Sequence, residues 1–367
     1  MSDMTNSNAV RDTSEILNII GTPFENAKKL NRVTDDKLVR IYEHAFYNRV
    51  APLYLHMYRR DGWCDKLKEL YVRVKEREAM TLTVLSDLAA NLNDWNEDGY
   101  VIFKSLKPYP AIPNDTDVLI FGGKREFKSA LEHLYSKGYL FHEWAPMQTT
   151  LYDARGKGKI GVGKKGGTYY IDIYQNISTD YVNYLDEKAI KPHAIIREIN
   201  GINVRILKKE PELAVILFHN VFPERTFQLE HFYMPLYYLA DPEFDTDLFV
   251  RFTEENRMTY PVKTNLSLIE KLHHAHFGFV PDVVTQLLED WGRNWRETDR
   301  FVCADLETPY MFSPVTFWNT CIAKLGDTAF TNSLFVQGLH MLNPVFFWDV
   351  MLTLKKRFSE RGAYHME

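Results

Sequence analysis

The chain of 367 residues contains only three cysteines, at Cys64, Cys303 and Cys321. Because they are few, odd in number and far apart, they indicate neither a disulfide framework nor a zinc ribbon. Such sparse cysteine usage is typical of a reducing compartment, so we expect a cytoplasmic protein. The formal net charge is only −5 at pH 7. This charge argues against wholesale coating of nucleic acid, although a local basic patch stays compatible with it.

The sequence also lacks an apolar run of the kind that inserts into membranes. Residues 1–14 are polar and contain no apolar core of a secretory signal, so we expect a disordered tail there and no signal peptide. The most apolar late stretch, 334–354, is interrupted by several polar residues and a proline. That pattern predicts a buried helix rather than a membrane span, and no membrane partner is expected.

Apolar material is nevertheless plentiful, with 45% hydrophobic and 14% aromatic residues, which is enough for a large core. Residues 15–96 repeat apolar side chains at helical spacing. Short apolar runs separated by glycines and prolines then predict strands, with one helix after Gly122 and Gly123. The predicted fold class is α+β: a small mixed-sheet domain at 97–207 between an N-terminal helical region at 15–96 and a C-terminal helical domain at 208–367.

Two aspartates separated by one residue stand at the start of a strongly apolar strand candidate. A strand places residues i and i+2 on the same face, so Asp115 and Asp117 should point the same way. Two neighbouring carboxylates repel each other and stay ionised most easily with a cation between them. Magnesium prefers such oxygen ligands. The pair predicts half of a metal site, while a turn followed by an exposed strand end is the alternative, because Asn-Asp is a common turn pair.

A third aspartate lies inside another apolar strand candidate, Tyr-Tyr-Ile-Asp-Ile-Tyr at 169–174. Ile171 and Ile173 should face the core, so Asp172 should face the other way. A carboxylate in so apolar a strand is costly unless it is paired or solvated. If this strand lies beside that of Asp115 and Asp117, the three carboxylates converge. Taken alone, a solvated strand residue explains Asp172 equally well.

These motifs resemble the nucleotidyltransferase superfamily, which has the DNA polymerase beta-like fold. Its signature is a Gly-Ser or small-residue turn after a first strand, a short spacer, a pair of carboxylates alternating with hydrophobic residues, and a third carboxylate on a later strand. Here Lys104-Ser105 takes the place of the turn, Asp115-Thr116-Asp117-Val118 that of the pair, and Asp172 that of the third carboxylate. The chain is most similar to an uncharacterised bacterial and archaeal branch with helices on both sides of the sheet. That branch has a Tyr-Pro dipeptide in the spacer, as at Tyr109-Pro110.

The resemblance implies an enzyme that moves a nucleoside monophosphate from an NTP to a hydroxyl of an RNA, a protein or a small molecule. Asp115, Asp117 and Asp172 would be catalytic and would hold Mg²⁺ or Mn²⁺, with two metal ions clamping the triphosphate for in-line release of pyrophosphate. Lys104 and Ser105 would bind the nucleotide phosphates. A non-catalytic nucleotide- or nucleic-acid-binding module on the same fold is the alternative.

A stretch rich in glycine, lysine and arginine precedes the strand of Asp172. Its basic side chains could contact a triphosphate or an RNA backbone: Arg155, Lys157, Lys159, Lys164 and Lys165. A flexible hairpin between two strands is the simpler alternative. A very aromatic segment at 227–240 predicts a core helix more than a platform for stacking bases.

Overall fold

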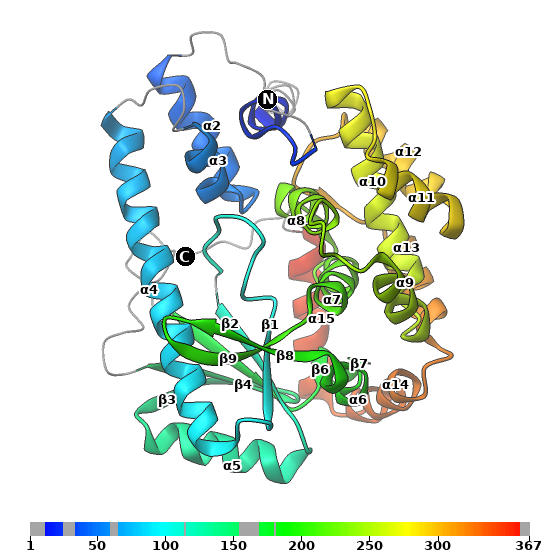
Figure 1. The fold of residues 1–367 in the computed structure, drawn as a ribbon. Helices are drawn as coiled ribbons and strands as arrows, with labels where there is room; N and C mark the ends of the chain where they lie inside the picture. The colour runs from blue at the N-terminus through cyan, green and yellow to red at the C-terminus, as the bar shows by residue number, and fades with distance from the viewer. Residues whose placement is uncertain are drawn as a thin grey trace.

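The computed structural model contains a seven-stranded mixed sheet with helical regions on both sides of it in sequence, which confirms the predicted α+β class (Figure 1). None of the helices it describes is both long enough and apolar enough to cross a membrane. The predicted basic stretch at 155–167 lies outside the described residues, which are 12–24, 34–58, 65–113, 115–153, 169–179 and 181–359.

The N-terminal region is helical, as its apolar periodicity predicts. A first helix covers residues 12–20. The next three are α2 (Asp35–Tyr47), α3 (Ala51–Tyr58) and the long α4 (Asp65–Asn96). Of the predicted disordered tail, residues 1–11 lie outside the described part, whereas residues 12–14 are already helical. Two side chains hold them there: Asp12 pairs with Arg40 at 2.8 Å, and Thr13 hydrogen-bonds His44 at 3.0 Å.

The sheet has the strand order β3-β4-β5-β2-β1-β9-β8. Its strands are β1 (Tyr100–Phe103), β2 (Asp115–Ile120), β3 (Tyr139–Ala145), β4 (Gln148–Asp153), β5 (Tyr170–Tyr174), β8 (Ala194–Ile199) and β9 (Ile202–Leu207). The first five of them, β1 to β5, lie in the short apolar runs that predict strands. The β8–β9 hairpin, at the edge of the sheet, is an addition that local periodicity does not single out. At the centre, β2 runs antiparallel to β1 and parallel to β5.

The two faces of the sheet pack against different helices. Val118 and Ile173 belong to the core beneath α4 and α5 (Lys124–Ser136). Leu119, on the opposite face of β2, belongs to a second core built largely from the C-terminal helices. The alternation along β2 and β5 therefore directs Asp115, Asp117 and Asp172 toward the C-terminal helices.

Short elements connect the sheet to the C-terminal region. They are β6 (Ile177–Thr179), β7 (Val182–Leu185), α6 (Glu187–Ile190) and a 3₁₀ turn, Lys191–His193. The loop between β1 and β2 reaches toward α8 (Figure 1). Two hydrogen bonds tie it there: the Tyr109 hydroxyl donates to the Glu230 carbonyl oxygen, and the Tyr238 hydroxyl donates to that of Leu106.

The C-terminal region is helical apart from the short strands β10 (Thr226–Phe227) and β11 (Tyr310–Met311). Its helices are α7 (Lys209–Val221), α8 (Leu229–Leu239), α9 (Thr246–Glu255), α10 (Thr259–Phe277), α11 (Asp282–Trp291), α12 (Trp295–Cys303), α13 (Pro314–Lys324), α14 (Thr328–His340) and α15 (Pro344–Ser359). Phe227, Phe232 and Tyr233 are fully buried, so the aromatic segment is core, as predicted. The single buried helix predicted at 334–354 is wrong, because α14 and α15 divide this stretch and several of its apolar side chains are exposed, among them Phe335, Leu342 and Trp348. The predicted domain boundaries stay predictions.

Candidate functional site

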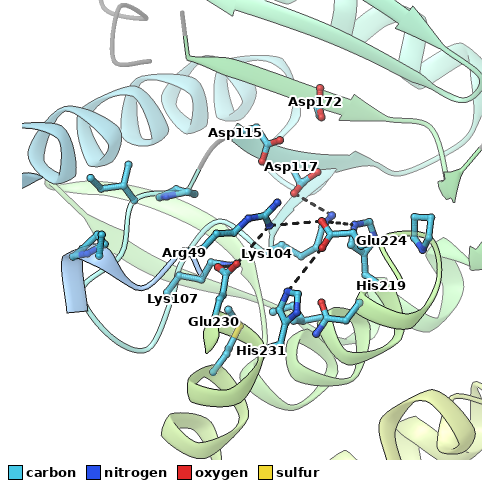
Figure 2. Close-up of a pocket in the computed structure, with 18 of the residues that line it drawn as sticks. Arg49, Lys104, Lys107, Asp115, Asp117, Asp172, His219, Glu224, Glu230 and His231 are labelled. Atoms are coloured by element: carbon cyan, nitrogen blue, oxygen red, sulfur yellow. Dashed lines mark ion pairs between the residues drawn. The ribbon is translucent and has the colours of Figure 1, made fainter. Parts of the chain in front are cut away.

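The structure brings the three predicted aspartates to one cavity. Asp115 and Asp117 come from β2 and Asp172 from β5, and Asp117 and Asp172 are register partners on these parallel strands. All three line a cavity of about 430 Å³ between the sheet and the helices. Figure 2 shows them on one side of it, with a group of basic and acidic side chains opposite. The Thr150 hydroxyl on β4 donates to Asp172 Oδ1 at 2.6 Å and fixes that carboxylate.

The carboxylates disfavour one another's ionisation. Burial, together with the nearby Asp117 and Asp172, raises the pKa of Asp115 to about 8. Burial and Asp117 raise the pKa of Asp172 to about 6, against the hydrogen bond from Thr150. Both shifts have the causes expected for acidic groups that share a partly dry site. Asp115 is therefore largely protonated at neutral pH when only protein groups surround it.

Lys104 directs its side chain to this carboxylate group. Its Nζ lies 3.2 Å from Asp117 Oδ2, and it also lies 5.1 Å from the centre of the Phe103 ring and 5.9 Å from that of Tyr174. The backbone N–H of Lys104 donates to Glu212 Oε1 at 2.6 Å. The φ of Lys104 is +57°, the left-handed region that favours glycine. The turn thus keeps the backbone that a glycine would adopt there, although a lysine occupies it.

Ser105 supports the site from beneath. Its hydroxyl donates to the Phe103 carbonyl oxygen at 3.0 Å and accepts the backbone N–H of Asp117 at 3.1 Å. The side chain is buried. A hydroxyl has one hydrogen to donate, and Ser105 has given it to Phe103. In this conformation its side chain positions Asp117 and has no hydrogen left for the phosphate role predicted from the sequence.

Thr116, between the paired aspartates, faces the opposite core. Its hydroxyl hydrogen-bonds the Tyr169 hydroxyl at 2.9 Å, and Thr116 is fully buried. A buried polar group of this kind is tolerated because it is paired. A threonine can therefore stand at this core position, where an aliphatic residue would be expected, because its hydroxyl is paired.

A second charged group faces the carboxylates across the cavity, and sequence reasoning missed it. Arg49, in the link between α2 and α3, lies 3.7 Å from Glu224 Oε1 and 3.5 Å from Glu230 Oε2. Lys107 Nζ lies 3.1 Å from Glu230 Oε1. Burial alone would raise the pKa of both glutamates, but Arg49 and His219 hold that of Glu224 well below its usual range. Lys107 and Arg49 likewise lower the pKa of Glu230.

Two histidines complete this group. His219 Nδ1 is 2.9 Å from the Tyr184 hydroxyl, and its Nε2 is 3.6 Å from Glu224 Oε1. Burial lowers the pKa of His219, and the positive charge of Lys104 lowers it further. Burial also lowers the pKa of His231 to about 4, despite Glu224. Both rings are therefore neutral near pH 7 and serve as hydrogen-bonding groups.

No local sequence pattern marks these residues. Arg49, Lys107 and Glu224 lie in three different loops, and only the packing of the N-terminal helices and α8 on the sheet brings them together. The positive φ of Arg49, +57°, is the one local oddity, but it is a backbone property that a single sequence does not reveal.

Within the described residues, no three His, Cys, Asp or Glu side chains are placed so as to hold a metal ion. The three aspartates face one cavity, yet their carboxylates are not gathered around a common point. Lys104, rather than a fourth acidic group, is the close partner of Asp117.

Comparison with known proteins adds little beyond this geometry. No protein-family model matches the chain, and no curated protein matches its sequence. Among solved structures, an antigenic nucleotidyltransferase-like protein from Paracoccidioides brasiliensis is similar to it. The two share 14% identity with a TM-score of 0.29, over 66% of this chain and 98% of the other. A similarity so weak assigns neither a family nor residue roles, so the function has to be inferred from the chemistry of the site itself.

Proposed function

We propose that this protein is a metal-dependent nucleotidyltransferase that transfers a nucleoside monophosphate from an NTP to a hydroxyl group of an RNA, a protein or a small molecule. One observation carries the proposal: three carboxylates from adjacent strands line a single cavity, and two of them have a raised pKa because they are buried together. Groups with perturbed pKa values in a cleft are candidates for chemistry rather than for stability.

The donor set suits Mg²⁺ or Mn²⁺ in kind, because both prefer carboxylate oxygens. Burial and the repulsion from Asp117 and Asp172 together raise the pKa of Asp115, and a bound cation would offset both effects. Asp115, Asp117 and Asp172 would hold the metal after turning their side chains toward a common centre, since the described arrangement does not gather them. When bound, the metal supplies charge neutralisation for the triphosphate and acidifies the attacking hydroxyl.

The basic side chains opposite suit the remaining phosphate charge. Arg49 faces the carboxylates in Figure 2. Its positive charge offsets part of the rise that burial causes in the pKa of Asp115. Its planar guanidinium can donate two parallel hydrogen bonds to one phosphate. Arg77 of α4 and Lys107 also line the cavity. We assign Arg49 the main phosphate contact, because its guanidinium faces the carboxylates of the sheet in Figure 2.

In the proposed reaction the acceptor oxygen attacks the α-phosphorus of the NTP and forms a new P–O bond. The bond from the α-phosphorus to the bridging oxygen of the β-phosphate breaks, and pyrophosphate leaves with that oxygen and its electrons. The hydroxyl proton would pass to Asp172, a carboxylate that faces the same cavity. The Thr150 hydroxyl keeps Asp172 oriented during this step.

A second candidate function is a binding module without turnover. The ammonium group of Lys104, which neutralises Asp117, favours this function. In addition, no set of three possible ligands among the described residues is arranged to hold a metal ion. Such a protein would bind a nucleotide or a nucleic acid through Arg49, Arg77 and Lys107 without needing a divalent cation.

Calorimetry separates the two functions. We expect a non-hydrolysable NTP analogue to bind the wild-type protein at least about tenfold more tightly with Mg²⁺ than with EDTA, because the metal bridges phosphate and carboxylates. Equal affinity in both conditions, or binding of RNA alone without metal, would sink the enzymatic proposal and favour the binding module. Asp117→Asn should lose this dependence on Mg²⁺, and Asp299→Asn, on the exposed face of α12, is its matched control.

A further inference from the structure

The ammonium group of Lys104 lies next to the Asp117 carboxylate, and this contact limits how many metal ions the site can hold. We propose that the Lys104 ammonium group occupies the place of one metal ion, so that the protein binds a single divalent cation where three carboxylates could otherwise hold two. This inference rests on the proposed function, since it concerns the same site. It assigns Lys104 as a fixed cation of the catalytic centre rather than a nucleotide ligand.

The protein provides a specific place for this ammonium group. Its Nζ is 3.2 Å from Asp117 Oδ2 and lies near the Phe103 and Tyr174 rings, which are arranged edge to face with 5.7 Å between their centroids. Aromatic faces and a carboxylate together are a favourable setting for a desolvated cation. The side chain is only 13% exposed, so little water competes for it.

The turn that carries Lys104 also aims its side chain. The left-handed backbone of Lys104 is unfavourable for a residue with a Cβ, yet Glu212 holds it by accepting the Lys104 N–H. Ser105 meanwhile fixes the Asp117 backbone from the next position. A part-buried hydrogen bond therefore holds the Lys104 end of the pair and a buried one holds the Asp117 end, so the pair is not a chance surface contact.

The positive charge of Lys104 acts on all three carboxylates. Lys104 pairs directly with Asp117 and lines the same cavity as Asp115 and Asp172. A divalent ion bound at Asp117 beside this ammonium would be repelled by it. Asp115 and Asp172 would hold the one divalent cation after turning their side chains toward it, since both line the cavity and Asp117 is the carboxylate that pairs with Lys104.

The experiment counts manganese ions per chain. The full-length protein is titrated with Mn²⁺ in the presence of a non-hydrolysable NTP analogue, and bound ions are counted by equilibrium dialysis and observed by electron paramagnetic resonance. Two ions about 4 Å apart, the spacing of two-metal sites, give a spin-coupled spectrum, whereas a single ion does not. We expect one uncoupled ion in the wild type and two coupled ions in Lys104→Met.

Two control variants distinguish the effect of the positive charge at position 104 from the loss of a lysine elsewhere. Lys104→Arg retains the positive charge and should still bind one ion. Lys209→Met removes a cation that pairs with Asp241, away from the residues that line the cavity, and should also bind one. Circular dichroism verifies that each variant is folded, and two coupled ions in the wild type overturn the inference even if Lys104→Met is unstable.

The outcomes separate the inference from the function on which it rests. Two coupled ions in the wild type overturn the inference and leave the nucleotidyltransferase proposal standing. One ion in both the wild type and a folded Lys104→Met also overturns it. No bound ion in any variant overturns both, because the carboxylates would then not form a metal site at all.

Discussion

Asp117 and Asp172 lie directly beside each other on the parallel strands β2 and β5, and both face the cavity. Parallel pairing at this register puts two carboxylates on one face with their backbones at neighbouring-strand distance. The buried Ile171 and Ile173 on the other face fix the register, because a slip of one residue would turn Asp172 into the apolar core and turn both isoleucines toward the cavity. The acidic centre is therefore a consequence of core packing.

Cation binding should depend on pH through Asp115. Its pKa of about 8 means that a cation must displace a proton from it below that pH. The apparent affinity for Mn²⁺ should thus rise by up to about tenfold per pH unit between pH 6 and 8, and level off above. Calorimetry in buffers of different ionisation enthalpy should register the released proton. Affinity that stays flat over this range in the wild type would contradict the role of Asp115.

Without a bound cation, the Asp115 carboxyl should make the folded protein less stable as the pH rises. The folded protein keeps the Asp115 proton up to about pH 8, whereas the unfolded chain loses it above about pH 4. The folded state therefore binds more protons in this window, and the free energy of unfolding falls as the pH rises. Between pH 7 and 8, Asp115→Asn should show a shallower fall in melting temperature than the wild type.

Ser105→Ala should destabilise the protein even when no nucleotide is present. It leaves the buried N–H of Asp117 without its acceptor, which costs about 1–3 kcal/mol of unfolding free energy. Denaturant unfolding measures this, with Ser136→Ala, whose hydroxyl lies at an exposed helix end, as the control. Unchanged stability with weakened nucleotide binding would instead support the phosphate role predicted from the sequence.

Arg49→Met should weaken binding of an NTP analogue by roughly tenfold to a hundredfold. This is the effect expected from the loss of one hydrogen bond between charged groups, which contributes about 1.5–3 kcal/mol. Arg49→Lys should recover part of the loss, because it restores the charge without the planar fork. Arg40→Met removes a guanidinium that pairs with Asp12 instead and should bind the analogue normally. Equal affinity in the Arg49 and Arg40 variants would remove Arg49 from the phosphate site.

Local sequence pattern is enough to find the strands that carry the site. Alternation around Asp172 and the apolar run after Asp117 are periodic signals that depend on near neighbours only. The sequence does not predict that these two strands pair, because strand partners far apart in sequence leave no local signal. The convergence of the three carboxylates is therefore expected only if the strands are neighbours. The structure meets that condition.

The opposite wall of the cavity is beyond such reasoning. Arg49 and Glu224 are 175 positions apart, by their numbering, and each lies in a loop without a motif. The sequence singles out Lys104, but the direction of its side chain depends on a left-handed backbone and on Glu212, which is 108 positions away. Charged side chains in loops acquire their partners from tertiary packing, so composition and spacing cannot assign them.

The most direct test of the proposed activity is label transfer from α-³²P-labelled NTPs with Mg²⁺, using cellular RNA and protein as acceptors, in the wild type and in Asp117→Asn. We expect labelled product with the wild type, and a loss of at least about a hundredfold with Asp117→Asn, because the central carboxylate of the site is neutralised. Asp299→Asn should retain the wild-type rate. Equal labelling by wild type and Asp117→Asn, or no labelling by the wild type with any NTP, would contradict the proposal.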